Sequence, residues 1–339
     1  DVAEETRELG AYPEDSAGGL MTTEYVALSP GTKVWEAIEA VRRLSREEQT
    51  ETVYYIYVCG YGRKLLGVLS LRDLILADPG QALADVMVTQ VVRVAPTDDQ
   101  EKVADTIARY DLSAIPVIDS RGRMLGVVTI DDVVDVVIEE ATEDAHMMGG
   151  VVPLEGSYFS TGVIEFVWKR AFWLIVLFFG QLLTATVMEG NQRILQHTLD
   201  LVIFVPLIIA SGGNAGSQSS SLIIRALAIG EMQPGDWLRV LRRETSIGLA
   251  LGLLLGVIGY GRAFFAGTAV DPAAIALAVG GSIVAVVVLG TLVGSLLPVL
   301  IQRLGFDPAV SSTPFIASLV DVLGLLVYFR IAAWVLTLL

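Results

Sequence analysis

Acidic side chains cluster at one place in the sequence, with a spacing that could bind a metal ion. Seven carboxylates lie between positions 131 and 144: Asp131, Asp132, Asp135, Glu139, Glu140, Glu143 and Asp144. Those at positions 132, 135, 139 and 143 would share one helical face, where like charges repel. A divalent cation would relieve this repulsion, and Mg²⁺ prefers carboxylate oxygens as ligands. The alternative is a solvated acidic surface.

A second candidate is Asp321, a lone carboxylate in an apolar stretch that extends from residue 308 to residue 329. A charge inside a membrane-spanning segment costs at least about 2.5 kcal/mol, so it persists where water, a cation or a partner meets it. The alternative is a salt bridge to Arg330, but nine residues of helix separate the two by about 13 Å. We therefore expect Asp321 to be a ligand in an ion pore.

The third feature is a polar run, Ser211-Gly-Gly-Asn-Ala-Gly-Ser-Gln-Ser-Ser-Ser221, inside another apolar stretch. Asn214 and Gln218 are four residues apart, so a helix places them on one face with Ser211 and Ser221. Polar groups at membrane depth must face protein or water, which favours a pore lining. Because small residues also permit close contact between helices, simple packing is the alternative.

Composition places these candidates in two different environments. The 339 residues are 53% hydrophobic and 18% charged, which excludes a wholly soluble, collagenous or disordered chain. Residues 1–150 contain 28 Asp and Glu against 13 Lys and Arg, whereas residues 151–339 contain 10 of each. The acidic first part repels nucleic acid and attracts cations. A single cysteine, Cys59, excludes an internal disulfide.

The first part of the chain contains an internal repeat. Leu20-Met-Thr-Thr23 and Val86-Met-Val-Thr89 are 66 residues apart, and Gly67-Val-Leu-Ser-Leu-Arg-Asp73 matches Gly126-Val-Val-Thr-Ile-Asp-Asp132 at an offset of 59. Each copy predicts an extended segment, a helix, two strands and a second helix. The pattern resembles a tandem pair of cystathionine β-synthase (CBS) domains.

In CBS pairs, a Gly-x-x-Ser/Thr-x-x-Asp element often holds an adenine nucleotide at a strand–helix junction. The resemblance implies ATP as an optional ligand of Ser70, Asp73, Thr129 and Asp132. The alternative is that these hydroxyl and carboxylate groups only cap the helices that follow them. Of the two interpretations, we favour capping alone.

The second part of the chain contains apolar stretches that could cross a membrane. A spanning helix needs about 20 mostly apolar residues, and we expect five such helices, in residues 171–188, 201–224, 245–261, 272–302 and 308–329. Basic residues favour one set of loops: Lys169, Arg170, Arg225, Arg239, Arg242, Arg243 and Arg303 lie on one side, and Arg193 and Arg262 on the other. The positive-inside rule then predicts a cytoplasmic first part and an external C-terminus.

Taken in order, these motifs resemble the MgtE family of magnesium channels and transporters. The matching pieces are Tyr12-Pro-Glu-Asp-Ser-Ala-Gly-Gly-Leu-Met21, the CBS pair, Glu140-Ala-Thr-Glu-Asp144, Gly212-Gly-Asn-Ala-Gly216 with Ile223-Ile-Arg-Ala-Leu227, and Asp321-Val-Leu-Gly-Leu-Leu. The resemblance implies a homodimer in the cytoplasmic membrane that transports Mg²⁺ and carries a cytosolic Mg²⁺ sensor. It implies pore ligands at Asp321, at the carbonyl of Ala317 and at Asn214, and it adds Asp15 to the regulatory carboxylates.

The expected fold is an α+β cytosolic tandem CBS pair followed by an all-α membrane domain of five transmembrane helices. Expected boundaries are 1–19 for an N-terminal segment, 20–82 and 83–145 for the CBS domains, 146–168 for a linker and connecting (plug) helix, and 169–339 for the pore domain. The connecting helix is expected to begin at Ser160-Thr161. Two departures from the family are expected: Thr313 stands where a pore-facing Asn is usual, and the eleven residues before Tyr12 leave no room for a superhelical domain.

Three functions fit these features. The first is a Mg²⁺-selective channel that is gated by Mg²⁺ on the acidic faces of the CBS dimer and tuned by adenine nucleotide. The second is a broader transporter of divalent cations such as Mn²⁺, Co²⁺ or Zn²⁺, which a ring of Asp side chains also accepts. The third is a nucleotide-regulated carrier of another solute, although Asp321 argues against anions. The residues match no catalytic motif, so we expect no enzyme; membrane lipid is an expected partner and nucleic acid is not.

Overall fold

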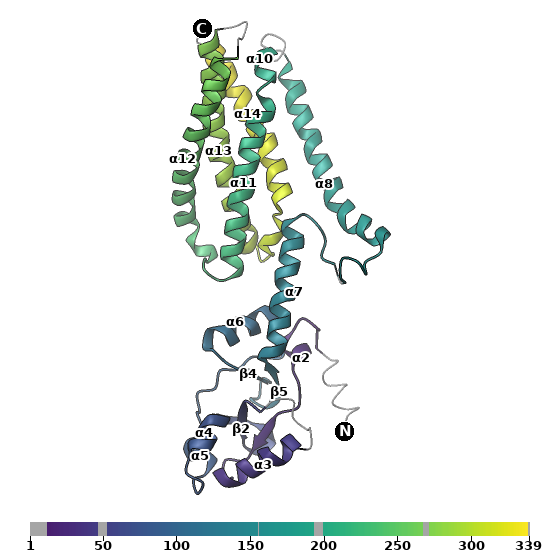
Figure 1. Cartoon of the computed structure of the whole chain (residues 1–339), viewed down its shortest axis with the longest axis vertical. Coiled ribbons are helices and arrows are strands. Elements are labelled where there is room, and N and C mark those ends of the chain that lie inside the picture. Colours follow the sequence, from purple (N-terminus) through teal and green to yellow (C-terminus); the bar gives the residue numbers. More distant parts are fainter. Residues whose placement is uncertain (1–11, 47–52, 155, 193–198, 267–270, 338–339) are drawn as a thin grey trace. The chain divides into compact units, whose positions relative to one another are not determined.

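The computed structural model describes residues 12–46, 53–154, 156–192, 199–266 and 271–337 (Figure 1). The chain divides into two compact units, Asp1–Ala141 and Thr142–Leu339. The first unit combines short strands with helices, and the second consists of long helices.

The first unit contains both copies of the repeat, and each has a helix, two strands and a second helix in the same order. Copy one comprises α2 (Ala17–Leu20), β1 (Val26–Leu28), α3 (Val34–Arg46), β2 (Tyr55–Cys59), η1 (Tyr61–Arg63), β3 (Leu65–Ser70) and α4 (Leu71–Leu76). Copy two comprises α5 (Leu83–Val86), α6 (Gln100–Tyr110), β4 (Ala114–Ile118), β5 (Met124–Thr129) and α7 (Ile130–Met148). The predicted order of a helix, two strands and a second helix is confirmed in both copies.

The two copies complete each other's sheets. In copy one, β1 pairs in parallel with β2, and β2 pairs antiparallel with β3; in copy two, β4 pairs antiparallel with β5. Thr22, which precedes β1, bridges to Val127 in β5. Val88, its equivalent at the 66-residue offset, bridges to Val68 in β3. This reciprocal pairing ties the two copies into one pair of domains.

The core of each copy forms where its strands meet its first helix. Ile56 and Val58 of β2 are fully buried with Val34 of α3, and Ile115 of β4 is fully buried with Val103 of α6. The α3 and α6 side chains recur at helical spacing, which is why the sequence pattern identified both helices. The burial of these apolar side chains is the main source of stability in a domain of this size.

Five long helices form most of the described part of the second unit. They are α8 (Val163–Gly190), α11 (Val205–Ala228), α12 (Trp237–Phe264), α13 (Pro272–Arg303) and α14 (Thr313–Thr337), with shorter elements α10 (Leu199–Val202), η2 (Pro234–Asp236) and η3 (Pro308–Val310) between them. The central helix, α13, packs against α11, α12 and α14, whereas α8 packs against α14 (Figure 1).

Four helices of the described chain are long and apolar enough to cross a membrane: α8, η2 with α12, α13 and α14. The remaining long helix, α11, has 24 residues but carries the polar run, and it is not among the four. An all-α membrane domain after the CBS pair is therefore supported, and the number of five transmembrane helices stays a prediction. Arg193, which entered the orientation argument, lies outside the described residues.

Glycines allow α11 and α13 to approach closely. A Cβ atom added to Gly290 would overlap the carbonyl oxygen of Gly212, and one added to Gly294 would overlap that of Gly216. Small residues at such crossings are typical of membrane helices. The packing interpretation of the polar run is thus correct for Gly212 and Gly216.

Two helices begin at different residues from those expected. The helix expected from Ser160-Thr161 begins at Val163, because the backbone N–H groups of residues 160 and 161 both donate to Ser157 O in a preceding turn. It then continues without interruption to Gly190, so residues 163–190 contain no separate connecting helix. The third apolar stretch was expected from residue 245, but α12 begins at Trp237 and therefore includes Glu244.

Candidate ion pore and regulatory sites

Asp321 lies in the middle of α14 and faces two neighbouring helices. Its Oδ2 atom accepts a hydrogen bond of 3.1 Å from Nε2 of Gln181 on α8. On α11, a Cβ atom added to Gly213 would lie 3.5 Å from Asp321 Oδ1 and 3.6 Å from the Cβ atom of Ala317. Because Gly213 has no side chain, Asp321 and Ala317 stay accessible beside α11, next to Asn214.

Polar groups of α11 have different surroundings along the helix. Asn214 and Gln218 are exposed on the face that the sequence predicted for them. Ser211 and Ser221 donate to carbonyls one turn earlier in their own helix, those of Leu207 at 2.7 Å and Ser217 at 3.0 Å. The two amides are therefore the groups of this stripe that remain available to an ion or its hydration water.

The salt-bridge explanation of Asp321 does not hold in the described part of the chain. Neither Asp321 nor Arg330 forms an ion pair there, and Arg330 is exposed on α14. Gln181 satisfies one carboxylate oxygen with a neutral donor, which leaves the negative charge uncompensated by protein. Such a group can attract a cation.

A second carboxylate in the membrane domain, Glu244, was missed by the sequence analysis. It lies on α12, is only 8% exposed, and its Oε2 atom accepts a 2.7 Å hydrogen bond from Oγ of Ser219 on α11. The sequence had suggested that Asp321 is the only carboxylate inside an apolar helix. Glu244 is a second one. Because Arg242 and Arg243 precede Glu244, the sequence pattern resembled a charged loop.

The beginning of α14 is connected to the end of α7. Thr313 Oγ1 donates to the carbonyl of Met148 at 3.0 Å. Gly150 has a φ of +69°, which favours glycine, and a Cβ atom there would lie 3.5 Å from both Ser312 Oγ and Pro314 Cγ. Thr313 thus binds the backbone carbonyl of the last residue of α7.

All seven carboxylates of the acidic cluster lie on α7. Asp132 accepts from Thr129, and Glu140 Oε1 accepts from Gln100 Nε2 at 2.6 Å. The backbone N–H of Gln100 in turn donates to the carbonyl of Asp15 at 3.0 Å. Gln100 therefore brings Asp15 and Glu140 to the same edge of the first unit.

No metal site is complete within one copy of the described chain. Among the described residues, no three His, Cys, Asp or Glu side chains come close enough together to hold an ion. Asp135 and Glu139 are exposed on α7, and Glu143 lies further along the same helix. The assignment of a regulatory cation to these carboxylates stays a prediction.

Each candidate nucleotide-binding pair lies at the strand–helix junction that the repeat predicted. Ser70 accepts from the backbone N–H of Asp73 at 3.0 Å and donates to its carboxylate at 2.6 Å, at the start of α4. At the start of α7, the Asp132 carboxylate accepts from the backbone N–H of Thr129 at 3.3 Å and from its hydroxyl at 2.6 Å. Both pairs therefore make helix-capping interactions, as the alternative interpretation expected.

The two pairs differ in their access to a cleft. A cleft of about 190 Å³ between the two copies is lined by Ser70, Asp73, Tyr55 and Tyr57, whereas Thr129 and Asp132 are not among its lining residues. Burial raises the pKa of Tyr57 far above its usual value. In the described chain the Tyr57 hydroxyl is buried without a hydrogen-bond partner.

Comparison with known proteins identifies the family of this chain. A family model described as a divalent cation transporter, MgtE, matches residues 205–331, and the CBS domain model matches residues 17–80 and 83–139. The magnesium transporter MgtE of Thermus thermophilus is 43% identical over 328 residues, which cover 97% of this chain and 72% of that protein. The chain belongs to the MgtE family.

Other MgtE proteins agree with this assignment. The magnesium transporter MgtE of Enterococcus faecalis is 36% identical, over 98% of this chain and 72% of its own length. A crystal structure of the cytosolic domain of the Mg²⁺ channel MgtE in complex with ATP is 50% identical over 39% of this chain and 53% of that chain, with a TM-score of 0.37. Inosine-5'-monophosphate dehydrogenases match weakly, over at most 39% of this chain.

Two polar contacts of this MgtE chain were not predicted from its sequence. Gln181 is a single amide in an apolar stretch, and its partner Asp321 is 140 residues away. Ser219 and Glu244 are both recognisable as polar residues in the sequence, but only the packing of α11 against α12 and α13 brings them together. Counting every polar residue in a predicted span, rather than only carboxylates, would have found Gln181.

Proposed function

We propose that this protein is a homodimeric channel for Mg²⁺ in the cytoplasmic membrane, in which Asp321 of each subunit binds the conducted ion. The observation that supports this best is the carboxylate in the middle of α14, which lies opposite Gly213 and carries no ion pair within the described chain. The MgtE relatives at 43% and 36% identity, each named a magnesium transporter, support the same ion.

The chemistry of Mg²⁺ suits one carboxylate per subunit. Mg²⁺ requires nearly octahedral oxygen coordination and loses its water reluctantly. Two Asp321 side chains on a two-fold axis would hold the water shell of the ion, together with the Ala317 carbonyl one turn earlier and the Asn214 amide on α11. Since an ion must also leave a pore, contact through water is better suited to conduction than full dehydration.

The surface of α7 supports a dimer of the CBS units. Ile130, Val134, Val137 and Ile138 are exposed large apolar side chains at helical spacing, a pattern typical of a helix face that another chain covers. The acidic residues at positions 132, 135, 139 and 143 lie on the same helix. A dimer through α7 would bring two acidic surfaces near each other, where Mg²⁺ would bridge carboxylates that otherwise repel.

The end of α7 gives this sensor a route to the pore. Met148 accepts from Thr313 at the first residue of α14, and Gly150 packs against Ser312 and Pro314. Asp321 lies on the same helix, eight residues later. Movement of α7 when Mg²⁺ binds would therefore displace the start of α14 and change the width of the pore.

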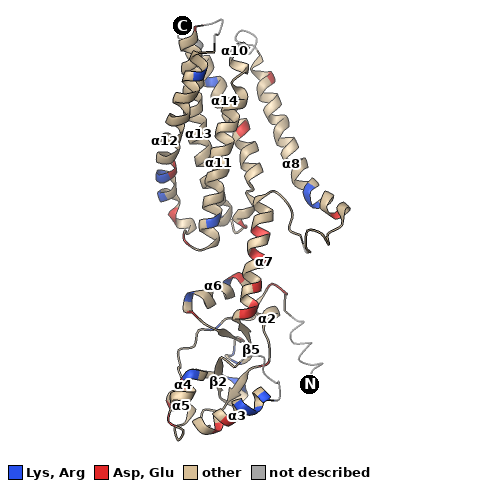
Figure 2. Cartoon of the chain, in the orientation of Figure 1, with Lys and Arg blue, Asp and Glu red and all other residues tan. Residues whose placement is uncertain are grey.

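The orientation of the channel follows from its basic residues. Arg225 and Arg303 lie in the last turns of α11 and α13, and Arg239, Arg242 and Arg243 lie in the first turns of α12. Figure 2 shows basic residues at the end of the bundle where α11 ends and α12 begins. By the positive-inside rule this end faces the cytoplasm, which places the CBS unit inside the cell and the C-terminus outside. A broader transport of Mn²⁺, Co²⁺ or Zn²⁺ is the second candidate function, because an Asp ring binds these ions too.

The cleft between the CBS copies supports nucleotide binding as a further property. It presents the Ser70 and Asp73 side chains to one space, which Tyr55 and Tyr57 also line. A carboxylate can accept from ribose hydroxyls, and two tyrosine rings can pack against a base. We propose ATP as the ligand of this cleft and regard the Thr129–Asp132 pair as a cap.

A flux assay on the purified protein in liposomes tests the pore. Asp321→Ala should abolish Mg²⁺ flux or its preference over Na⁺, because no other charged group at that depth of α14 replaces the carboxylate, while the dimer stays intact on size-exclusion chromatography. Arg330→Gln, which changes an exposed charge on the same helix, serves as the matched control. Normal Mg²⁺-selective flux through Asp321→Ala would refute the assignment of Asp321 to the pore. Competition by Mn²⁺, Co²⁺ and Zn²⁺ in the wild type separates a Mg²⁺-selective channel from a broader transporter of divalent cations.

A further inference from the structure

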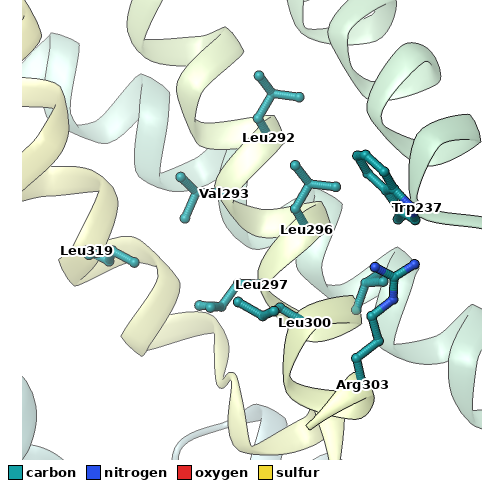
Figure 3. A pocket seen from close by; sticks show the side chains of 9 residues that line it. Trp237, Leu292, Val293, Leu296, Leu297, Leu300, Arg303 and Leu319 are labelled. Carbon is teal, nitrogen blue, oxygen red and sulfur yellow. The ribbon is translucent and has the colours of Figure 1, made fainter. Parts of the chain in front are cut away.

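The second unit has an apolar groove that ends at a basic residue (Figure 3). Its volume is about 440 Å³, and it is formed by α13 with the beginnings of α12 and α14. Leu296, Leu300 and Leu319 line its apolar part, and Trp237 and Arg303 lie at one end. Its volume is in the range typical of sites for small ligands.

The guanidinium group at the end of the groove is held in place. Arg303 Nε donates to the carbonyl of Pro234 at 2.9 Å, and the guanidinium carbon lies 5.7 Å from the centroid of the Trp237 ring. These two contacts use one nitrogen and one face of the group. Within the described chain neither Nη atom has a hydrogen-bond or ion-pair partner, so both remain available to an anion.

The groove lies on the side of α14 that faces away from the candidate pore. Leu319 precedes Asp321 by two residues, which is a rotation of about 200° around a helix. A groove that contains Leu319 therefore opens away from the carboxylate of Asp321, toward lipid rather than toward the proposed two-fold axis. The exposed side chains of Leu300 and Leu304 continue the apolar surface at this end of α13.

We propose that this groove binds an anionic phospholipid, with the phosphate on the Nη atoms of Arg303 and an acyl chain along Leu296, Leu300 and Leu319. Arginine is well suited to phosphate because its nitrogens match two phosphate oxygens. Tryptophan is enriched at the level of lipid headgroups. Arg239 is paired with Asp236, but Arg242 and Arg243 at the start of α12 add positive charge at the same end of the bundle, and anionic headgroups complement this charge.

The leaflet that supplies the lipid depends on the membrane orientation given under the proposed function. If the Arg303 end of the groove is cytoplasmic, the lipid comes from the inner leaflet. Binding itself does not depend on Mg²⁺ transport. A negative result for lipid binding would therefore not affect the assignment of the pore. A negative result for Asp321 in the flux assay would likewise not affect the assignment of the groove.

Quenching of Trp237 by brominated lipid tests the proposal. The full chain with Trp35, Trp168, Trp173 and Trp334 replaced by Phe retains Trp237 as the single tryptophan. It is placed in vesicles that contain equal mole fractions of either brominated phosphatidylglycerol or brominated phosphatidylcholine with the same chains. We expect phosphatidylglycerol to bind about fivefold more tightly, the effect of one basic residue near an anionic surface.

Arg303→Gln in this background should remove the preference, whereas the control Arg330→Gln, an exposed arginine on α14, should retain it. Equal quenching by both lipids in the parent would show that the groove has no headgroup selectivity and would overturn the proposal. Protection of Trp237 from both lipids would show that a second copy of the chain covers the groove, with the same consequence. A preference that survives Arg303→Gln would overturn the role of Arg303, and the parent comparison stands even if that variant does not fold.

Discussion

Gln181 on α8 donates a hydrogen bond of 3.1 Å to the carboxylate of Asp321 on α14. The amide is neutral, so it orients the carboxylate without neutralising its charge. One oxygen of Asp321 is thereby fixed, and the other faces the open position beside Gly213. This hydrogen bond between α8 and α14 also restrains how far the two helices can separate.

Gln181→Leu should reduce Mg²⁺ flux severalfold, because a hydrogen bond to a charged group contributes about 1.5–3 kcal/mol and Asp321 would lose its orientation. Radioactive or fluorescent Mg²⁺ uptake into liposomes measures the effect. Thr186→Val on the same helix is the matched control, since Thr186 bonds only to Leu182 of α8. If both variants conduct like the wild type, the Gln181 contact has no part in conduction.

The buried pair of Ser219 and Glu244 should matter for stability. Ser219→Ala leaves the Glu244 carboxylate without its donor on α11, at a cost of about 1–3 kcal/mol, and should lower the melting temperature in detergent by a few degrees. Glu244→Gln should be milder, because its amide oxygen still accepts from Ser219. Ser246→Ala, which removes an exposed hydroxyl bonded within α12, is the control. Equal melting of Ser219→Ala and Ser246→Ala would contradict the prediction.

Patterns along the sequence predicted the elements that repeat or that are long. The 66- and 59-residue offsets reappear as equivalent strands and helices, because each copy buries the same apolar positions. Asp321 was identifiable because one charge among apolar residues has a large energetic cost. The acidic face of α7 was identifiable because the helical period places its members together.

Contacts between distant segments could not be predicted in this way. The bonds from Gln181 to Asp321 and from Thr313 to Met148 join residues 140 and 165 positions apart. Their formation depends on how α8 and the end of α7 pack against α14, which no local period determines. The start of α12 was misplaced for a related reason: its charged first turns are stabilised by tertiary contacts that hydropathy does not measure.

The crossing of α11 and α13 gives a third prediction. Gly294→Ala places a methyl group against the carbonyl of Gly216, and overpacking of this kind costs about 1–3 kcal/mol. The variant should melt at a lower temperature and lose flux, because α11 carries the residues beside Asp321. Gly281→Ala on the same helix, where an added Cβ meets no atom within 4 Å, should be neutral or slightly stabilising. Similar melting of the two variants would show that the helices can separate freely.

Nucleotide binding should depend on the strand–helix junction of copy one and not on that of copy two. Asp73→Ala removes a carboxylate that lines the cleft, and we expect the affinity for ATP to fall about tenfold, in line with the loss of a charged hydrogen bond. Asp132→Ala removes the equivalent cap, which does not line that cleft, and should change the affinity less than about twofold by the same reasoning. Equilibrium dialysis with labelled ATP measures both. Equal losses in the two variants would indicate two nucleotide sites, and no binding by the wild type would reject ATP as the ligand.

The final prediction concerns the acidic face of α7 and its effect on the pore. Neutralisation by Asp135→Asn, Glu139→Gln, Glu140→Gln and Glu143→Gln should abolish the inhibition of flux by cytosolic Mg²⁺. Without these carboxylates Mg²⁺ gains no difference in affinity between the open and closed arrangements, and a ligand without such a difference shifts no equilibrium. The selectivity of the pore should be unchanged, because Asp321 lies on α14.

The resting state of this variant follows from the size of two opposing effects. Neutralisation removes repulsion between exposed carboxylates, which salt screens and which is worth little. It also removes the bridges through Mg²⁺ that would lock the closed state, and these are the larger effect. We therefore expect a channel that is mostly open at every Mg²⁺ concentration. Asp85→Asn with Asp105→Asn, which lowers the negative charge of the same unit without changing a residue of α7, is the control and should still close. If the wild type closes with Mg²⁺ and the fourfold variant closes at the same concentration, the acidic face of α7 is solvated surface and the sensor lies elsewhere.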